Sequence, residues 1–345
     1  MSYKFDFNKE AQNTLEQYGF ALSNTLLVHF KANAGREGLS VLCDDDSRKK
    51  TVEDVEVRKF LAHRIEKVRK RRAPEAAHHA ASGMRSVVFS DDMDLSDIGD
   101  GQDPDKIRSF LFDHETLGHC ATAGGLTDID IGCEMKADSS ATLHHIKRFK
   151  EDGAELAEHI AWFRAMEMLT HNNADHMTAQ VIDHIIYNIS PQALSATNPK
   201  DMLERADNLA ADHRPPSLGV EKALSTYTFL KGNTSPTSLM RNDMELLHKT
   251  ASTALQSPDW FSFYIGARFF QPFLKPEGVT IQDINIKLDE DTRQNYADRI
   301  MSAAYKFKLN DLFIQTQINV RDISERPALK AQVLAARNNP QPNTA

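Results

Sequence analysis

Apolar and polar residues follow two different periods along the chain, and the period changes near residue 133. In the first part, three short runs combine β-branched and aromatic residues and end in turn-forming residues, which is typical of strands. These runs are 25–32, 38–44 and 85–90. Three other segments space their apolar residues as one face of a helix does. These segments are 8–19, 50–72 and 105–122, and the last begins at a favourable start, Asp103-Pro104-Asp105. The stretch 73–83, rich in Ala, His and Gly, is predicted to be a loop.

From about residue 133 onward the apolar spacing is helical almost without interruption. The predicted helices are 133–150, 152–171, 173–188, 200–212, 218–231, 238–256, 258–273, 287–308 and 326–338. The predicted fold is therefore mainly α (α+β class), with a small N-terminal β-sheet and a helical C-terminal region.

The same patterns suggest a division of the chain. We expect a core over residues 1–190 and a helical region, 191–338, packed on it, or both parts joined in one continuous domain. The tail 339–345 is polar and contains proline, so we expect it to be disordered.

Composition narrows the class of protein. Hydrophobic residues make up 41% and charged residues 26%, as in globular rather than disordered chains. A net charge of −8 gives no reason to expect nucleic-acid binding. The sequence has no apolar run long enough to span a membrane and no apolar N-terminal core typical of a signal peptide. We therefore predict a cytoplasmic protein, and export without an N-terminal signal stays open.

The candidate chemistry begins at His114-Glu115-Thr116-Leu117-Gly118-His119. On a regular α-helix, residues four apart lie about 40° from each other around the axis, whereas residues five apart lie about 140° apart. His114 and His119 can therefore share a metal ion only if the helix widens by one residue between them, as a π-bulge does. Gly118 has no β-carbon and lowers the cost of such an irregular turn.

A third ligand is available on the next predicted helix. Glu134 follows His119 by 134 − 119 = 15 residues, enough for a loop and an antiparallel return. Asp138, one helical turn beyond Glu134, is placed to accept a hydrogen bond from the far nitrogen of a ligating histidine. Two histidines and a glutamate are a frequent ligand set for zinc. Cys120 and Cys133 flank the motifs, so a mixed Cys/His site is the alternative.

This two-part pattern resembles the gluzincin metallopeptidases, in which a helix with two histidines precedes a helix carrying Glu and then Asp. "HETLGH" has the H-E-x-x-G-H form of the dipeptidyl peptidase III family, and "CEMKAD" is similar to that family's second segment. The resemblance covers residues from about 113 to 141. The chain is much shorter than typical members of that family and its half-motifs lie closer together, so dipeptide release does not carry over.

The resemblance implies a zincin-like core and a role for each residue. His114, His119 and Glu134 would bind Zn2+, and Glu115 would act as general base. Gluzincins stabilise the oxyanion with a His or Tyr further along, and the favoured candidates here are His184 and Tyr187. Zincins also hold an extended peptide along an edge strand, for which 85–90 is the candidate.

Three functions of different classes follow from these observations. The leading prediction is a zinc-dependent hydrolase, a metalloprotease acting on a peptide or protein. The second is a metal-dependent hydrolase that uses the same site on a non-peptide substrate. The third is a non-enzymatic helical interaction protein with a structural metal site.

Overall fold

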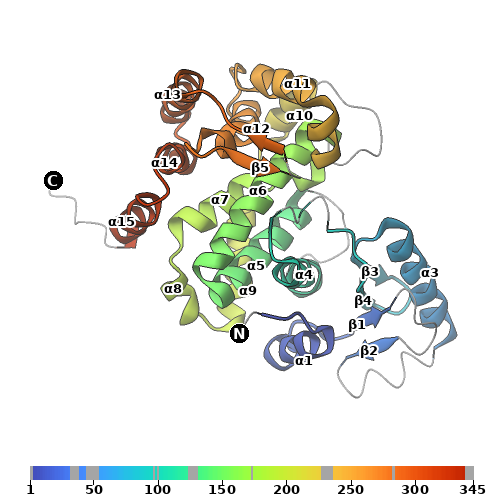
Figure 1. The fold of residues 1–345 in the computed structure, drawn as a ribbon. Coiled ribbons are helices and arrows are strands. Elements are labelled where there is room, and N and C mark those ends of the chain that lie inside the picture. Colours follow the sequence, from blue (N-terminus) through green and yellow to red (C-terminus); the bar gives the residue numbers. More distant parts are fainter. Residues whose placement is uncertain are drawn as a thin grey trace. The chain divides into compact units, whose positions relative to one another are not determined.

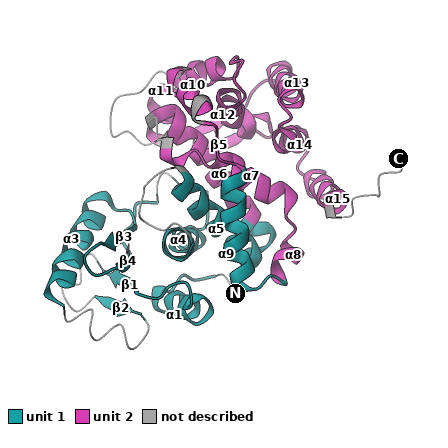
Figure 2. Cartoon of the chain, turned by 180° about the vertical axis from the view of Figure 1, so that it is seen from behind, with its two compact units in different colours: residues 1–153, 196–212 teal, residues 154–195, 213–345 magenta. Residues whose placement is uncertain are grey.

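The computed structural model describes residues 3–31, 39–43, 54–95, 98, 101–122, 131–171, 174–226, 236–281 and 284–338. The chain forms two compact units (Figure 2). Unit 1 comprises residues 1–153 and 196–212, and unit 2 comprises residues 154–195 and 213–345. The predicted disordered tail lies outside the described residues.

Unit 1 is built around a four-stranded sheet with the order β2-β1-β4-β3 (Figure 1). Its strands are β1 (Thr25–Phe30), β2 (Ser40–Leu42), β3 (Glu75–His79) and β4 (Met84–Ser90). The central strands β1 and β4 are parallel, in register from Thr25 opposite Arg85 to Phe30 opposite Ser90. The two outer strands pair antiparallel to them. The small N-terminal sheet expected from the sequence is therefore present.

Both faces of this sheet are covered, because alternate side chains of the central strands point in opposite directions. Leu26, Val28 and Val88 pack against α3 (Val55–Arg71) on one face. Leu27 and Val87 belong to the other apolar cluster, which includes residues of α1 (Phe7–Tyr18) and α4 (Pro104–Asp113). This burial on both sides explains why all six residues of β1 are buried.

Three further elements complete unit 1. A π-helix, η2 (His114–Ala121), continues α4 directly. The long helix α5 (Ile131–Phe149) packs against η2, and α9 (Pro199–Asp212) packs against α5. The Nζ atom of Lys147 on α5 donates to the Thr197 carbonyl oxygen at 2.6 Å, and Lys136 pairs with Asp207 at 3.6 Å. These contacts join residues 196–212 to α5 within unit 1.

Unit 2 is mostly helical. Its helices are α6 (Glu151–His171), η4 (Ala174–His176), α7 (Ala179–Asn188), α8 (Pro191–Ser195), α10 (Ser217–Thr226), α11 (Pro236–Ala254), α12 (Trp260–Phe270), η5 (Gln271–Leu274), α13 (Glu290–Lys306), α14 (Asn310–Asn319) and α15 (Arg326–Asn338). Helix α6 belongs to this unit from Ala154 onward. Helix α12 is buried along its whole length after Trp260 and forms part of the core of this unit. A short hairpin of β5 (Val279–Ile281) and β6 (Ile284–Ile286) interrupts the predicted run of helices. No helix in the described ranges has the length and apolar character needed to cross a bilayer.

One prediction for unit 1 is wrong. The stretch 73–83 is not a loop throughout, because Glu75–His79 forms β3, paired with β4 from Glu75 opposite Val88 to His79 opposite Met84. Its alanines and histidines have little preference for strands, so the pairing with β4 determines the conformation. Strand β4 consequently pairs on both sides and is an interior strand. The edge strand beside the motif is β3, not 85–90.

Candidate metal centre

The helix that carries the two histidines changes its geometry where the motif begins. Helix α4 ends at Asp113, and residues His114–Ala121 form the π-helix η2. In a π-helix each backbone N–H bonds to the carbonyl five residues back, so side chains five apart lie on the same side. The widened helix that the five-residue spacing requires is therefore present.

Side-chain hydroxyls assist this irregular segment. Thr116 Oγ1 donates to the Phe112 carbonyl oxygen at 2.6 Å, and Thr122 Oγ1 donates to that of Gly118. Such bonds to a carbonyl four residues back bend helices and supply partners to carbonyls that a disturbed ladder leaves open. The Arg85 guanidinium of β4 donates to the Cys120 carbonyl oxygen, which ties the end of η2 to the sheet.

Gly118 also has a role that the spacing of the motif did not predict. Its backbone does not adopt the left-handed conformation that favours glycine. A β-carbon at position 118 would instead lie 2.3 Å from the Ala137 Cα atom of α5 and 2.7 Å from the Ala137 Cβ atom. Glycine is therefore required for the close approach of η2 to the helix that carries Glu134 and Asp138.

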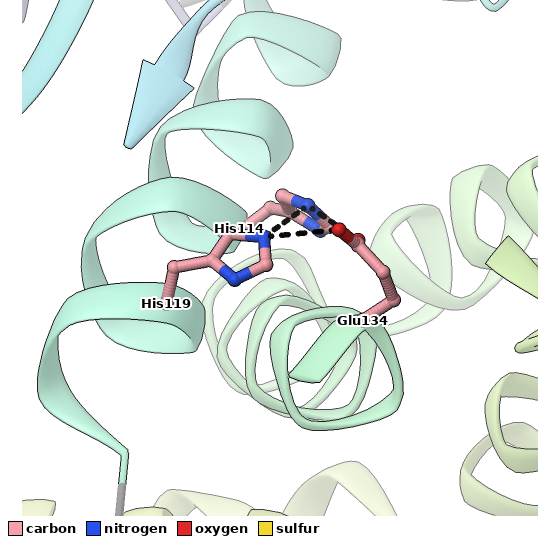
Figure 3. Close-up of side chains that lie close together, drawn as sticks. All are labelled: His114, His119 and Glu134. Atoms are coloured by element: carbon pink, nitrogen blue, oxygen red, sulfur yellow. Dashed lines mark hydrogen bonds and ion pairs between the residues drawn. The ribbon is translucent and has the colours of Figure 1, made fainter. Parts of the chain in front are cut away.

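Three potential ligands meet between these two helices (Figure 3). The Nε2 atoms of His114 and His119 are 3.2 Å apart. His114 Nε2 lies 3.4 Å from Glu134 Oε2, and His119 Nε2 lies 3.6 Å from Glu134 Oε1. With one atom taken from each residue, all three donor atoms lie within 4.8 Å of one another. The group could hold a metal ion.

These distances can be compared with a metal site. In a tetrahedral zinc site with ligands about 2.0 to 2.1 Å from the ion, neighbouring donor atoms lie about 3.3 to 3.4 Å apart. The two nitrogens lie 3.2 Å apart, and the nearest Glu134 oxygens lie 3.4 Å from His114 Nε2 and 3.6 Å from His119 Nε2, but these are two different oxygens of the carboxylate. With a single Glu134 oxygen as donor, the three donor atoms lie within 4.8 Å of one another. The two histidine nitrogens are thus spaced as in a four-coordinate site, and the Glu134 carboxylate would have to turn to present one oxygen to both of them. An ion held in this way would have one position left for another ligand.

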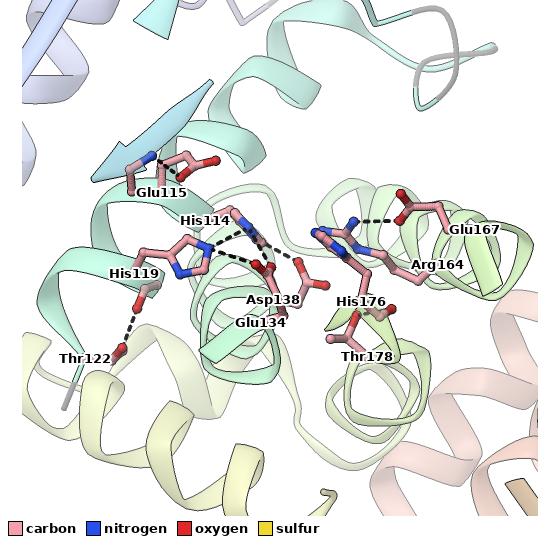
Figure 4. A network of polar contacts seen from close by, with 12 residues as sticks. His114, Glu115, His119, Thr122, Glu134, Asp138, Arg164, Glu167, His176 and Thr178 are labelled. Atoms are coloured by element: carbon pink, nitrogen blue, oxygen red, sulfur yellow. Dashed lines mark hydrogen bonds and ion pairs between the residues drawn. The ribbon is translucent and has the colours of Figure 1, made fainter. Parts of the chain in front are cut away.

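Asp138 fixes the orientation of the first histidine (Figure 4). His114 Nδ1 donates to Asp138 Oδ1 at 2.8 Å, and the Asp138 side chain has no solvent exposure. Because Nδ1 carries the proton in this bond, the neutral ring presents the lone pair of Nε2 toward His119 and Glu134. This is the arrangement in which a histidine binds a metal ion through Nε2 and is held by a carboxylate behind it.

The electrostatics of the site favour a cation. Burial on its own lowers the pKa of His114, but the carboxylates of Asp138 and Glu134 outweigh burial and raise this pKa to about 10. Two buried carboxylates thus face two imidazole rings, and the surroundings of His114 stabilise positive charge.

Glu115 is held apart from the three ligands. Its Oε2 atom accepts a hydrogen bond from the Ala76 backbone N–H of β3 at 2.9 Å, and the residue is 9% exposed (Figure 4). This anchor could not be predicted from the sequence, because a backbone amide carries no residue signature and 75–79 was not predicted as a strand.

The other predicted site residues lie in unit 2. The Tyr187 hydroxyl of α7 donates to Glu158 Oε1 at 2.9 Å, and the Tyr187 side chain is buried. His184 Nδ1 lies 3.3 Å from Asp311 Oδ2. Their part in stabilising an oxyanion stays a prediction. Cys120 is buried, and neither it nor Cys133 belongs to the metal-ligand group found among the described residues.

No protein-family model, no curated protein and no solved structure matches the chain.

Proposed function

We propose that the chain is a zinc-dependent peptidase that uses Glu115 as general base. The observation that carries the proposal is the meeting of His114, His119 and Glu134 at donor distances of 3.2 to 3.6 Å, with Asp138 behind the first histidine. Two nitrogens and one carboxylate oxygen, with a position open, are the ligand set of zinc in hydrolytic sites. The mixed sheet followed by two ligand-bearing helices supports a zincin-like core for unit 1.

A bound zinc ion would polarise a carbonyl group and lower the pKa of a water molecule to about 7. Glu115 Oε2 is occupied by the Ala76 N–H, which leaves Oε1 to take a proton from that water. As the water oxygen bonds to the scissile carbonyl carbon and the C–N bond breaks, Glu115 returns the proton to the leaving amine nitrogen. The hydrogen bond to Ala76 keeps the carboxylate in one orientation through both transfers.

The edge strand β3 supports a peptide as the substrate. The Ala76 N–H points away from β4 and is taken by Glu115. The Ala76 carbonyl and the backbone groups of His78 also face away from β4, along an edge with which no described strand pairs. An extended peptide can add to such an edge through backbone hydrogen bonds. A non-peptide substrate would make no use of this edge.

The test is cleavage of a denatured protein mixture, with new N-termini identified by mass spectrometry. We expect cleavage by the wild-type chain, loss on chelation and recovery with added zinc. Glu115→Gln should lower the rate by about 10² to 10⁴-fold with zinc content unchanged. Glu56→Gln is the matched control, because that side chain is 68% exposed and lies on α3. Cleavage that persists in Glu115→Gln, or stoichiometric zinc without any cleavage, would refute the peptidase proposal.

A further inference from the structure

Unit 1 contains a cavity with polar walls beside η2, the helix that carries His114 and His119. It has a volume of about 320 Å³ and lies between α1, the end of α4 and α5. Its walls include Asp113, Tyr18, His144 and Gln17, together with the charged residues Glu10 and Arg148. The size is at the lower end of the range of small-molecule sites, about 300 to 1,000 Å³.

Asp113 is the unusual member of this lining. It is 7% exposed, and no hydrogen bond or ion pair joins its carboxylate to another residue in the described ranges. Glu10, in contrast, is bonded through both oxygens to the Arg148 guanidinium, at 2.5 and 2.7 Å. A buried carboxyl group without a hydrogen-bonding partner is unfavourable, so a ligand that pairs with Asp113 would satisfy a polar group that the described residues leave unsatisfied.

The neighbouring groups offer hydrogen-bond acceptors. His144 Nδ1 donates to the Ser140 carbonyl oxygen at 2.7 Å, so Nε2 of the neutral ring is an acceptor. The Tyr18 hydroxyl must therefore donate its proton to His144 Nε2. Burial lowers the pKa of His144 to about 4, which keeps the ring neutral. The Tyr18 oxygen is left as an acceptor with lone pairs for another donor.

The basic residues at the cavity are already bound to oxygen atoms of the chain. Arg148 is paired with Glu10, and Lys147 Nζ donates to the Thr197 carbonyl oxygen at 2.6 Å. Asp113 is therefore a buried carboxyl group with no hydrogen-bond or ion-pair partner among the described residues, although the Arg148 guanidinium acts on it electrostatically. A cation that also donates hydrogen bonds would complement this group. A primary ammonium group meets both requirements with three N–H donors.

We propose that this cavity binds a small solute carrying a primary ammonium group, which pairs with Asp113 and donates to the Tyr18 oxygen. The proposal rests on Asp113, Tyr18 and the shape of the cavity, and it does not depend on hydrolysis at the metal centre.

The test is calorimetric titration of the full chain with n-butylammonium chloride at pH 8.5, where the amine carries its proton. We expect saturable binding at one site, weakened at least tenfold in Asp113→Asn. Asp152→Asn is the matched control, because its side chain is 69% exposed, and it should bind as the wild type does. The Tyr18→Phe variant should weaken binding while keeping the carboxylate.

Further variants and ligands separate this proposal from folding defects and from amine binding at a metal ion. Gln17→Phe alters only an exposed side chain at the cavity and should block binding with the fold retained. Tetramethylammonium, which has no N–H donor, and neutral 1-butanol should bind at least tenfold more weakly than butylammonium. The proposal would be overturned if wild type and Asp113→Asn bound butylammonium equally, or if tetramethylammonium bound as tightly as butylammonium. Binding that disappears on chelation, or a titration without saturable heat, would also overturn it.

Discussion

Gly118 of η2 lies so close to Ala137 of α5 that a β-carbon at position 118 would come within 2.3 Å of the Ala137 Cα atom. The contact joins the helix that carries both histidines to the helix that carries Glu134 and Asp138. The spacing of the candidate ligands therefore depends on the absence of one side chain.

Gly118→Ala should separate the two helices and weaken metal binding. The neighbouring atoms belong to the backbone and β-carbon of Ala137, which have no flexible end that can move aside, so we expect destabilisation of about 1 to 3 kcal/mol. We also expect a loss of zinc affinity of roughly tenfold or more, measured by competition with a chromophoric chelator. Gly219→Ala on α10 is the control, since its β-carbon would meet only ordinary contacts of 3.7 Å or more. Unchanged zinc affinity in Gly118→Ala would contradict this account of the contact.

Asp138→Asn should weaken the metal site without removing a ligand. The His114 Nδ1–H bonds to Asp138 at 2.8 Å, and an amide there loses the negative charge that supports the ring. Loss of such a partner typically lowers metal affinity by about 10- to 100-fold. Asp207→Asn, which alters a partly exposed ion pair with Lys136, should leave the affinity as it is. Equal affinities in the two variants would show that Asp138 does not orient His114.

Ala76→Pro should lower activity at constant zinc content. Proline removes the N–H that holds Glu115, and edge strands tolerate proline where the N–H faces away from the ladder. A hydrogen bond to a charged group contributes about 1.5 to 3 kcal/mol, so kcat/KM should fall by about 10- to 100-fold. His78→Pro, two residues along the same edge, should have a smaller effect on turnover. A larger loss in His78→Pro than in Ala76→Pro would contradict the role of the amide in holding Glu115.

His145→Leu should reduce the acid sensitivity of folding. His145 is fully buried beside the Phe110 and Phe149 rings, and neither of its ring nitrogens has a hydrogen-bond partner within the described part of the chain. Burial, with nearby Arg148 and Lys106, lowers its pKa to about 3. In the unfolded chain the pKa of His145 is about 6.5, so below that pH the unfolded chain binds a proton that the folded chain does not bind. The free energy of unfolding therefore falls by about 1.4 kcal/mol for each unit by which the pH is lowered.

Urea denaturation at pH 7, 6 and 5 measures this effect. The stability of His145→Leu relative to wild type should increase steadily as the pH is lowered. His63→Leu is the control on an exposed position of α3, and its difference from wild type should not grow in that way. A constant difference between His145→Leu and wild type across this range would show that His145 is not held neutral.

The sequence predicted the elements whose pattern is local. Strands β1 and β4 were predicted from runs of β-branched and aromatic residues. The start of α4 was predicted from Asp103 and Pro104, and the Asp103 side chain accepts the N-cap hydrogen bond from the Asp105 N–H. The widened turn between His114 and His119 could be inferred because five-residue spacing on a regular helix separates the rings.

Features that depend on distant pairing could not be inferred in this way. Strand β3 exists because it pairs with β4, although Ala76 and Ala77 have low strand preference, and the anchor of Glu115 on Ala76 depends on that strand. Gly118 was predicted to permit an irregular turn, but its close approach to Ala137, which follows it by 137 − 118 = 19 residues, was not predicted. No local pattern indicates which side chain will lie opposite a glycine.

The central claim is that His114, His119 and Glu134 hold one zinc ion. It is tested most directly by the metal content of the purified chain, measured by plasma mass spectrometry after dialysis against dilute zinc. We predict one zinc ion per chain, with loss of that ion in both His119→Ala and Glu134→Ala and retention in His63→Leu. A wild-type chain without stoichiometric zinc, or full zinc content in the two ligand variants, would contradict the account.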